Sequence, residues 1–154
     1  MSLFTALFPP EDVVAELHAA LRPVRRAHPR LRWVDPRRWH VTVAFFGDAE
    51  PADQLAGLAG VAAPVLRLRG SGHFRQVLWI GVEGPLDELG RAAAGVSADW
   101  RPHLTVARGA PLPHVDFTGR EWTATEVALV LSRREGGYAV LDRVPLTTPI
   151  TPNE

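Results

Sequence analysis

A five-residue stretch occurs twice in this chain with one conservative change. Residues 40–44 read His-Val-Thr-Val-Ala, and residues 103–107 read His-Leu-Thr-Val-Ala. Alternate side chains of a β-strand point to opposite faces, so each copy would place its His and Thr on one face and its intervening aliphatic residue on the other. The repeat therefore predicts two strands that each present one imidazole and one hydroxyl, backed by apolar packing.

Chance is a poor explanation of the repeat. With six His and nine Thr in 154 residues, a His-x-Thr triplet is expected roughly 0.35 times, yet two occur, both followed by Val-Ala. The competing interpretation is that each His only hydrogen-bonds its Thr across a sheet. Two copies in matching context favour a shared site, in which one imidazole acts as a general base and the other as a general acid.

The bulk composition limits the class of protein. A chain of this length is expected to form one compact domain, residues 1–154, with two similar lobes that each carry one motif. Without cysteine it has no disulfide framework, no thiolate metal site and no cysteine nucleophile. No apolar run is long enough to cross a bilayer, and the apolar first ten residues lack the basic flank of a signal peptide. We expect a cytoplasmic protein with no membrane association, and nothing demands more than a monomer.

The positive charges are unevenly distributed. The net charge is zero, so no overall field attracts polyanions. Residues 22–38, however, hold seven Arg and a single acid, Asp35. This segment offers a phosphate-bearing partner a basic approach to the first motif. The alternative is an ordinary solvated surface, since the chain has no Lys and uses Arg for every cationic side chain.

Hydrophobic periodicity and turn residues predict the order of the elements. Seven strands are expected, at residues 3–8, 41–46, 65–69, 77–82, 104–107, 126–131 and 138–144. Three helices are expected, at residues 11–21, 51–62 and 85–94, and residues 70–72 (Gly-Ser-Gly) are expected to form a turn. No βαβ series or nucleotide-binding Gly fingerprint is present. This order predicts a mixed α+β fold.

The motif segments at residues 38–48 and 101–108 resemble those of the two-histidine phosphoesterases. The most similar branch is the bacterial and archaeal RNA 2′,3′-cyclic phosphodiesterase, historically called 2′-5′ RNA ligase. Softer similarities run along nearly the whole chain, at residues 3–4, 77–81 and 127–146. Between Leu86 and the second motif the chain is shorter than is typical of that branch.

The resemblance implies a bilobal, LigT-like α+β fold in which two antiparallel-rich sheets line a central cleft, with helices outside. It also implies that a ribose 2′,3′-cyclic phosphate, on an RNA 3′ end or a small nucleotide, is hydrolysed to a 2′-phosphomonoester without a metal ion or cofactor. By position, His40 would be the proton donor to the departing 3′-oxygen, and His103 the proton acceptor from water. Thr42 and Thr105 would donate hydrogen bonds to the phosphate oxygens.

Two further residues are candidate substrate contacts. Arg108 matches a family position that contacts phosphate, but it lies five residues after His103, so a regular strand would turn it to the opposite face and a bend is required. A surface Arg is the alternative. Phe74 lies in a loop that resembles a substrate-lining segment and would stack on a base, with core filling as the competing interpretation. Trp39 and Trp100 precede the motifs and are expected to wedge between helix and sheet.

Other functions compete with this one. The remaining histidines form no His-x-His or His-x₃-His pair, and no carboxylate accompanies either motif at ligand spacing, so no zinc site is expected. No Gly-x-Ser-x-Gly elbow supports a serine nucleophile. A non-catalytic module that binds terminal phosphates is the alternative of a different class, which the two intact His-Thr pairs disfavour. A 2′-5′ RNA ligase that runs the reaction backwards is a third interpretation, which water at ordinary concentration should disfavour.

Overall fold

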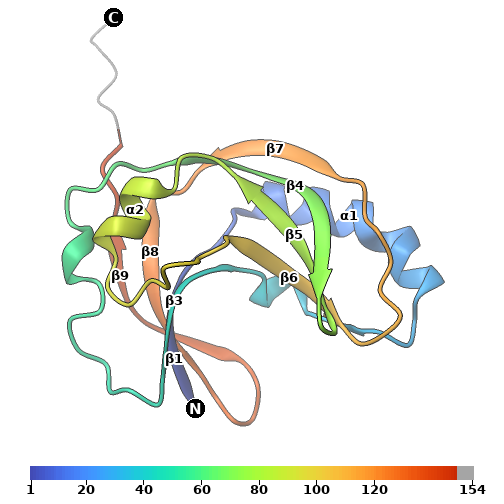
Figure 1. Cartoon of the computed structure of the whole chain (residues 1–154), viewed down its shortest axis with the longest axis horizontal. Helices are drawn as coiled ribbons and strands as arrows, with labels where there is room; N and C mark the ends of the chain where they lie inside the picture. Colours follow the sequence, from blue (N-terminus) through green and yellow to red (C-terminus); the bar gives the residue numbers. More distant parts are fainter. Residues whose placement is uncertain (149–154) are drawn as a thin grey trace, which may run out of the picture.

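The computed structural model describes residues 1–148, which form nine strands, two α-helices and two 3₁₀ turns (Figure 1). The strands are β1 (Ser2–Leu7), β2 (Arg32–Trp33), β3 (Val41–Gly47), β4 (Val65–Phe74), β5 (Val77–Glu83), β6 (His103–Arg108), β7 (Thr118–Thr123), β8 (Glu126–Ser132) and β9 (Tyr138–Pro145). The helices are α1 (Glu11–Ala27) and α2 (Asp87–Ala92), and the 3₁₀ turns are η1 (Pro36–Arg38) and η2 (Ala56–Leu58). No helix in this part of the chain is long and apolar enough to span a bilayer.

The strands form one curled antiparallel sheet with the order β7-β4-β5-β6-β3-β1-β8-β9, and β2 pairs with β6 outside this path. The half β3-β1-β8-β9 carries the first motif on β3, and the half β7-β4-β5-β6 carries the second motif on β6. The halves join where β3 and β6 have one residue pair in register, Val41 with Leu104. The predicted α+β fold built from antiparallel sheets is confirmed, and the two sheets are continuous at this pair.

The main hydrophobic core lies on one face of the sheet. Val41 and Leu104 are fully buried in it, and α1 contributes its buried face, made of Val13, Leu17 and Leu21. Because side chains alternate along a strand, the motif His and Thr side chains point to the other face. A smaller apolar cluster lies on the first half of the sheet, composed of Phe4, Ala6, Ala128 and Val130.

Helix α1 extends past its predicted end at residue 21. It continues through Pro23 to Ala27, although a proline inside a helix removes one backbone hydrogen bond and clashes with the preceding turn. Val24 packs against the main core, and Arg25 lies over the ring of Trp33. These tertiary contacts hold the last helical turn in place despite the proline.

The helix predicted at residues 51–62 is wrong. Only η2 is helical there, because Gln54 turns back on the chain: its side chain accepts from the Ala52 N–H and donates to the Glu50 carbonyl. These local bonds compete with the helical ladder and stabilise turns instead.

The turn predicted at residues 70–72 is also wrong, because these residues lie inside β4. Gly70 has a φ of +69°, and the register with β5 shifts there, so the glycine serves a β-bulge. The β4–β5 hairpin reverses later, next to Arg75, whose φ is +54°. This moves Phe74 from a loop into the end of a strand.

Two strands were not predicted from the sequence. β2 has only two residues, too few for a period to be recognised. β7 is an edge strand whose side chains are mostly polar, with Trp122 as its one large buried side chain. Edge strands of this kind carry little hydrophobic alternation.

Candidate active site

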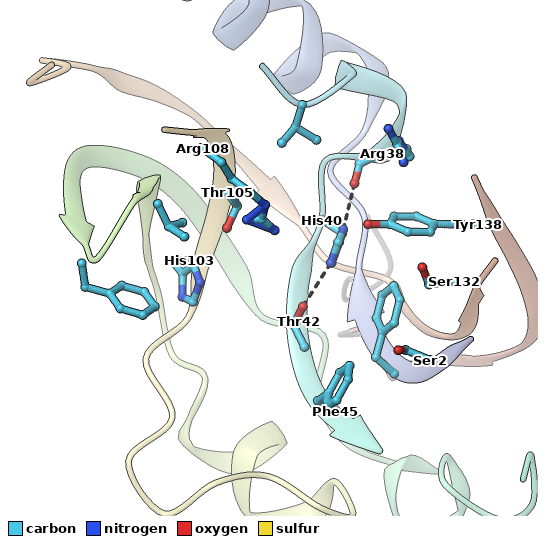
Figure 2. A pocket seen from close by; sticks show the side chains of 14 residues that line it. Ser2, Arg38, His40, Thr42, Phe45, His103, Thr105, Arg108, Ser132 and Tyr138 are labelled. Carbon is cyan, nitrogen blue, oxygen red and sulfur yellow. Dashed lines mark hydrogen bonds between the residues drawn. The ribbon is translucent and has the colours of Figure 1, made fainter. Parts of the chain in front are cut away.

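A cavity of about 390 Å³ opens where β3 and β6 meet, on the face of the sheet that bears the motif side chains (Figure 2). All six residues predicted for the site line it, namely His40, Thr42, Phe74, His103, Thr105 and Arg108. The other lining residues are Ser2, Phe4, Val34, Arg38, Phe45, Val77, Ser132 and Tyr138. The fold therefore brings the two motifs, far apart in the sequence, to one cavity.

The two motif histidines are held in the same way. Nδ1 of His40 donates to the carbonyl of Arg38 at 2.8 Å, and Nδ1 of His103 donates to the carbonyl of Arg101 at 2.7 Å. A carbonyl oxygen can only accept, so Nδ1 carries a proton in both rings. In each ring Nε2 is then the nitrogen that gains or loses a proton, which allows it to act as an acid or as a base.

His40 is enclosed by aromatic side chains. Its ring stacks on Phe4, with ring centroids 4.9 Å apart, and meets the edge of Tyr138 at 5.4 Å. Its Nε2 lies 3.1 Å from Oγ1 of Thr42, the contact drawn as a dashed line in Figure 2. The first motif thus forms an internally bonded His-Thr pair in a partly apolar setting.

This setting changes the acidity of His40. Burial lowers the pKa of the imidazole below its ordinary value, because a desolvated ring disfavours positive charge. The bond to the Arg38 carbonyl raises the pKa, whereas the positive charges of His103 and Arg108 lower it further. Compared with a free imidazole, the ring of His40 is therefore shifted toward its neutral form.

His103 has a different environment. Its ring lies 6.0 Å from that of Trp79 and 6.3 Å from that of Phe74, centroid to centroid. Within residues 1–148, His103 and Thr105 form no hydrogen bond of the kind that joins the first motif's pair. Two motifs of nearly identical sequence therefore offer one imidazole that is bonded to its threonine and one that is not.

Arg108 reaches the cavity through an irregularity in β6. Leu78 of β5 pairs with Ala107, but the next residue, Trp79, pairs with Thr105, so Val106 is an extra residue in β6. Such a β-bulge shifts the alternation of the strand by one residue. Thr105 and Arg108, three residues apart, consequently share the cavity face (Figure 2). The bend that Arg108 needs in order to share the face of His103 is therefore present in β6.

The same irregularity occurs on β3, at the equivalent place. Thr5 of β1 pairs with Ala44, and the next residue, Ala6, pairs with Thr42, so Val43 is the extra residue. Phe45 is thereby turned to the cavity, five residues after its motif histidine. The internal repeat therefore includes a bulge on each motif strand. At equivalent positions, the half that carries β3 has Phe45 and the half that carries β6 has Arg108.

Arg38 and Tyr138 are among the eight cavity residues that were not recognised as site residues from the sequence. The guanidinium of Arg38 lies 5.8 Å above the ring centre of Tyr138, an arrangement typical of a cation–π contact. Arg38 lies two residues before His40, at the end of the basic segment, and this position could have identified it. Tyr138 comes from β9 and reaches the site only because β9 pairs with β8, as in the pair Ser132–Tyr138. No local pattern identifies such a residue.

The two tryptophans that precede the motifs lie between helix and sheet, as expected. Trp39 is buried, and its ring meets the edge of His18 on α1 at 6.2 Å. Trp100 lies against Gly90 of α2. In addition, Nε1 of Trp100 donates to the carbonyl of Thr42 at 3.0 Å. The segment that leads into the second motif is thus bonded to the strand of the first.

The described part of the chain holds no group of three His, Asp or Glu side chains arranged to bind a metal ion. The other histidines stay out of the cavity: His18 bonds to Arg25 on α1, and the remaining ones are His28, His73 and His114.

Comparison with known proteins identifies the family. Residues 7–82 match the family described as LigT like phosphoesterase. A protein of Thermus thermophilus named RNA 2′,3′-cyclic phosphodiesterase is 34% identical, across 95% of this chain and 90% of the relative. The chain belongs to the LigT-like phosphoesterase family. The alignment with that relative spans 183 positions, more than the 154 residues of this LigT-like chain, so the relative has segments that this chain lacks.

Two solved structures share the LigT-like fold. A crystal structure of a Thermus thermophilus protein is 30% identical with a TM-score of 0.68, and the match covers 95% of this chain and 98% of that one. The crystal structure of E. coli LigT complexed with ATP is 25% identical with a TM-score of 0.71, over 95% and 98% of the two chains. The fold expected from the resemblance is confirmed.

Proposed function

We propose that this protein hydrolyses the 2′,3′-cyclic phosphate of RNA 3′ ends or small nucleotides to a 2′-phosphomonoester. The observation that carries the proposal is the cavity, where His40 and His103 each offer a titratable Nε2 beside both motif threonines. The name of the Thermus relative supports this substrate class. The ATP complex of E. coli LigT supports a nucleotide as the ligand.

The proposed reaction makes one P–O bond and breaks another. A water oxygen attacks the phosphorus, the bond from phosphorus to O3′ breaks, and the phosphate stays on O2′. Neutral His103 takes a proton from the attacking water at Nε2, while charged His40 gives its Nε2 proton to O3′. Each ring ends in the protonation state in which the other began, and exchange with solvent restores both.

The threonines and Arg108 would stabilise the phosphate as its negative charge builds up. The hydroxyls of Thr42 and Thr105 can each donate one hydrogen bond to a non-bridging oxygen. The Arg108 guanidinium offers several donors in a planar fork that suits phosphate oxygens. Fixed donors of this kind stabilise a transition state without having to reorganise.

The lowered pKa of His40 bears on its role. A neutral ring cannot donate the proton that the departing oxygen needs, so the charged form of His40 has to be present in the complex. A phosphodiester carries a negative charge, and a negative charge beside an imidazole favours the charged form. We therefore keep His40 as the proton donor, charged in the complex, and His103 as the proton acceptor.

Phe74 would bind the base of the substrate. It lies at the end of β4, lines the cavity and has 53% of its surface exposed. A core-filling role would require it to be buried. An exposed aromatic ring at the cavity edge suits stacking on a nucleobase, which tolerates any base.

We propose a monomer that acts in the cytoplasm on RNA ends or small nucleotides, with no metal ion and no other cofactor in the reaction. Size-exclusion chromatography with light scattering tests the monomer, and fractionation of the native cells tests the location.

Product analysis tests the proposed function. Uridine 2′,3′-cyclic phosphate is incubated with the purified protein in excess EDTA, and the product isomer is identified by ³¹P NMR. The expected product is uridine 2′-monophosphate. Turnover that requires a divalent cation would refute the metal-free mechanism, and a 3′-phosphate would reverse the assigned leaving group. Binding without turnover would favour the terminal-phosphate module, and a joined product on adding a 5′-hydroxyl oligonucleotide would favour the ligase.

A further inference from the structure

Arg32 lies directly opposite Arg108 in the pairing of β2 with β6. Directly opposite residues of an antiparallel pair project from the same face of the sheet, with Cβ atoms about 4.5–5.5 Å apart. Arg108 lines the cavity. Arg32 therefore stands beside it at the cavity's rim, one strand farther out.

The neighbours of Arg32 on its own strand confirm this orientation. Val34, two residues later, lines the cavity, and its N–H continues the pairing by donating to the Val106 carbonyl at 2.9 Å. Trp33, between them, points the other way, since it packs against the main core and its indole donates to the His28 carbonyl. Alternation along the segment places Arg32 on the face that bears the cavity.

This pair of arginines has no acid to balance it. Within residues 1–148, neither Arg32 nor Arg108 has a carboxylate within ion-pair distance, and Asp35, the single acid of the basic segment, is engaged by Arg37 at 2.7 Å. Like charges directly opposite each other destabilise a sheet. An anion bound between or beside the two guanidinium groups would remove that cost.

A further arginine lies at the same end of the cavity. Figure 2 shows Arg38 and Arg108 on either side of one end, and Phe45 with Ser2 at the other. The cavity therefore has a cationic end, which continues outward to Arg32, and an uncharged end. A nucleotide with a second negative group would be oriented by this difference.

We propose that Arg32 forms a second phosphate subsite, next to the one that contains Arg108. It binds a phosphate attached to the 5′-oxygen of the same ribose whose 2′,3′-cyclic phosphate is hydrolysed, and it rests on the proposed function. Thr42, Thr105 and Arg108 hold the reacting phosphate, and Arg32 stands one strand spacing away, about 4.8 Å, which suits a neighbouring phosphate of the same nucleotide. The 5′-phosphate has two sources, an RNA chain or a free nucleotide.

Rates on matched substrates test the subsite. We would compare kcat/KM for uridine 2′,3′-cyclic phosphate, for its 5′-phosphorylated form, and for the dinucleotide that ends in the same cyclic phosphate. The 5′-phosphate should raise kcat/KM roughly five- to tenfold at low salt, as expected for a charge-assisted contact at an exposed site. Arg32→Gln should reduce this advantage to near one. Arg91→Gln, which removes an exposed charge on α2 outside the cavity, should retain it.

The outcomes separate this inference from the proposed function. Hydrolysis of all three substrates with no 5′-phosphate advantage, or an advantage that survives Arg32→Gln, overturns the subsite and leaves the phosphodiesterase proposal in place. A dinucleotide faster than the 5′-phosphate form identifies RNA as the source, and a slower dinucleotide identifies the free nucleotide. If no substrate is hydrolysed, calorimetry with uridine 2′,5′-bisphosphate and uridine 2′-monophosphate decides, because the bisphosphate should bind more tightly only while Arg32 is present.

Discussion

Val41 and Leu104, the residues that directly follow the two motif histidines, pair with each other across β3 and β6. Both are fully buried in the main core. Their burial turns the adjacent His and Thr side chains of both strands to the opposite face, where the cavity lies. One core contact thus sets the positions of both motifs.

We propose that the two halves of the sheet form a single domain that unfolds as a unit. The main core contains residues from both, such as Leu3 in the first and Leu68 in the second. Urea unfolding followed by tryptophan fluorescence and by far-UV circular dichroism should give coincident transitions. Leu104→Ala should lower the unfolding free energy by about 2–5 kcal/mol and keep the transitions coincident. Two separate transitions in the wild type would contradict this.

Removing the hydrogen bond from Trp100 to the Thr42 carbonyl should lower the activity. Trp100→Phe keeps an aromatic ring but leaves the carbonyl of a motif residue unpaired, which should lower stability by about 1 kcal/mol and reduce kcat by disturbing Thr42. Trp33→Phe is the matched control, because it removes an indole bond of the same length to the His28 carbonyl, outside the motifs. Equal effects of the two variants on kcat would show that the bond does not position the motif.

The bulge that turns Arg108 to the cavity predicts that its side chain binds phosphate. Arg108→Gln should lower kcat/KM roughly 100-fold, the size expected for loss of a transition-state donor. Arg108→Lys should recover only part, because an ammonium group lacks the planar fork. Steady-state kinetics on a cyclic nucleotide measure both variants. Wild-type kinetics in the Arg108→Gln variant would show that this arginine is an ordinary surface residue that does not bind the phosphate.

The lowered pKa of His40 predicts how stability depends on pH. The pKa of His40 in the unfolded chain is about 6.5, and in the folded protein it is lower. Between these two values the unfolded chain binds more protons, so the free energy of unfolding falls as the pH drops from about 6.5 through the folded-state pKa.

The His40→Gln variant lacks the imidazole, so it loses the pH-dependent contribution of His40 to the free energy of unfolding. The stability difference between wild type and variant should therefore shrink as the pH is lowered from about 7.5 to about 5, as measured by urea unfolding at each pH. Parallel curves for the two proteins would mean that folding leaves the pKa of His40 unchanged.

The sequence identified the motif strands because their alternation is local. The order of apolar and polar residues at 40–44 and 103–107 specifies which side chains face the cavity, and the repeat specifies that there are two. The position of Arg108 required one further fact, the bulge at Val106, which depends on pairing with β5 and leaves no trace in the alternation itself.

Other features depend on contacts between distant segments. Tyr138 reaches the site through the pairing of β8 with β9, and Arg32 is placed beside Arg108 by a two-residue strand. The helix expected at residues 51–62 was wrong because side-chain bonds of Gln54 stabilise turns there. Hydrophobic periodicity contains none of this information.

The central claim is that His40 and His103 act together on one phosphorus atom, and a double-mutant cycle tests it most directly. His40→Ala and His103→Ala should each lower kcat roughly 10²–10⁴-fold while His114→Ala, an exposed histidine outside the cavity, leaves it unchanged. Because the two rings serve one step, the double variant should be about as slow as the slower single variant. A single variant that keeps wild-type activity, or a double variant whose loss equals the product of the two single losses, would contradict the claim.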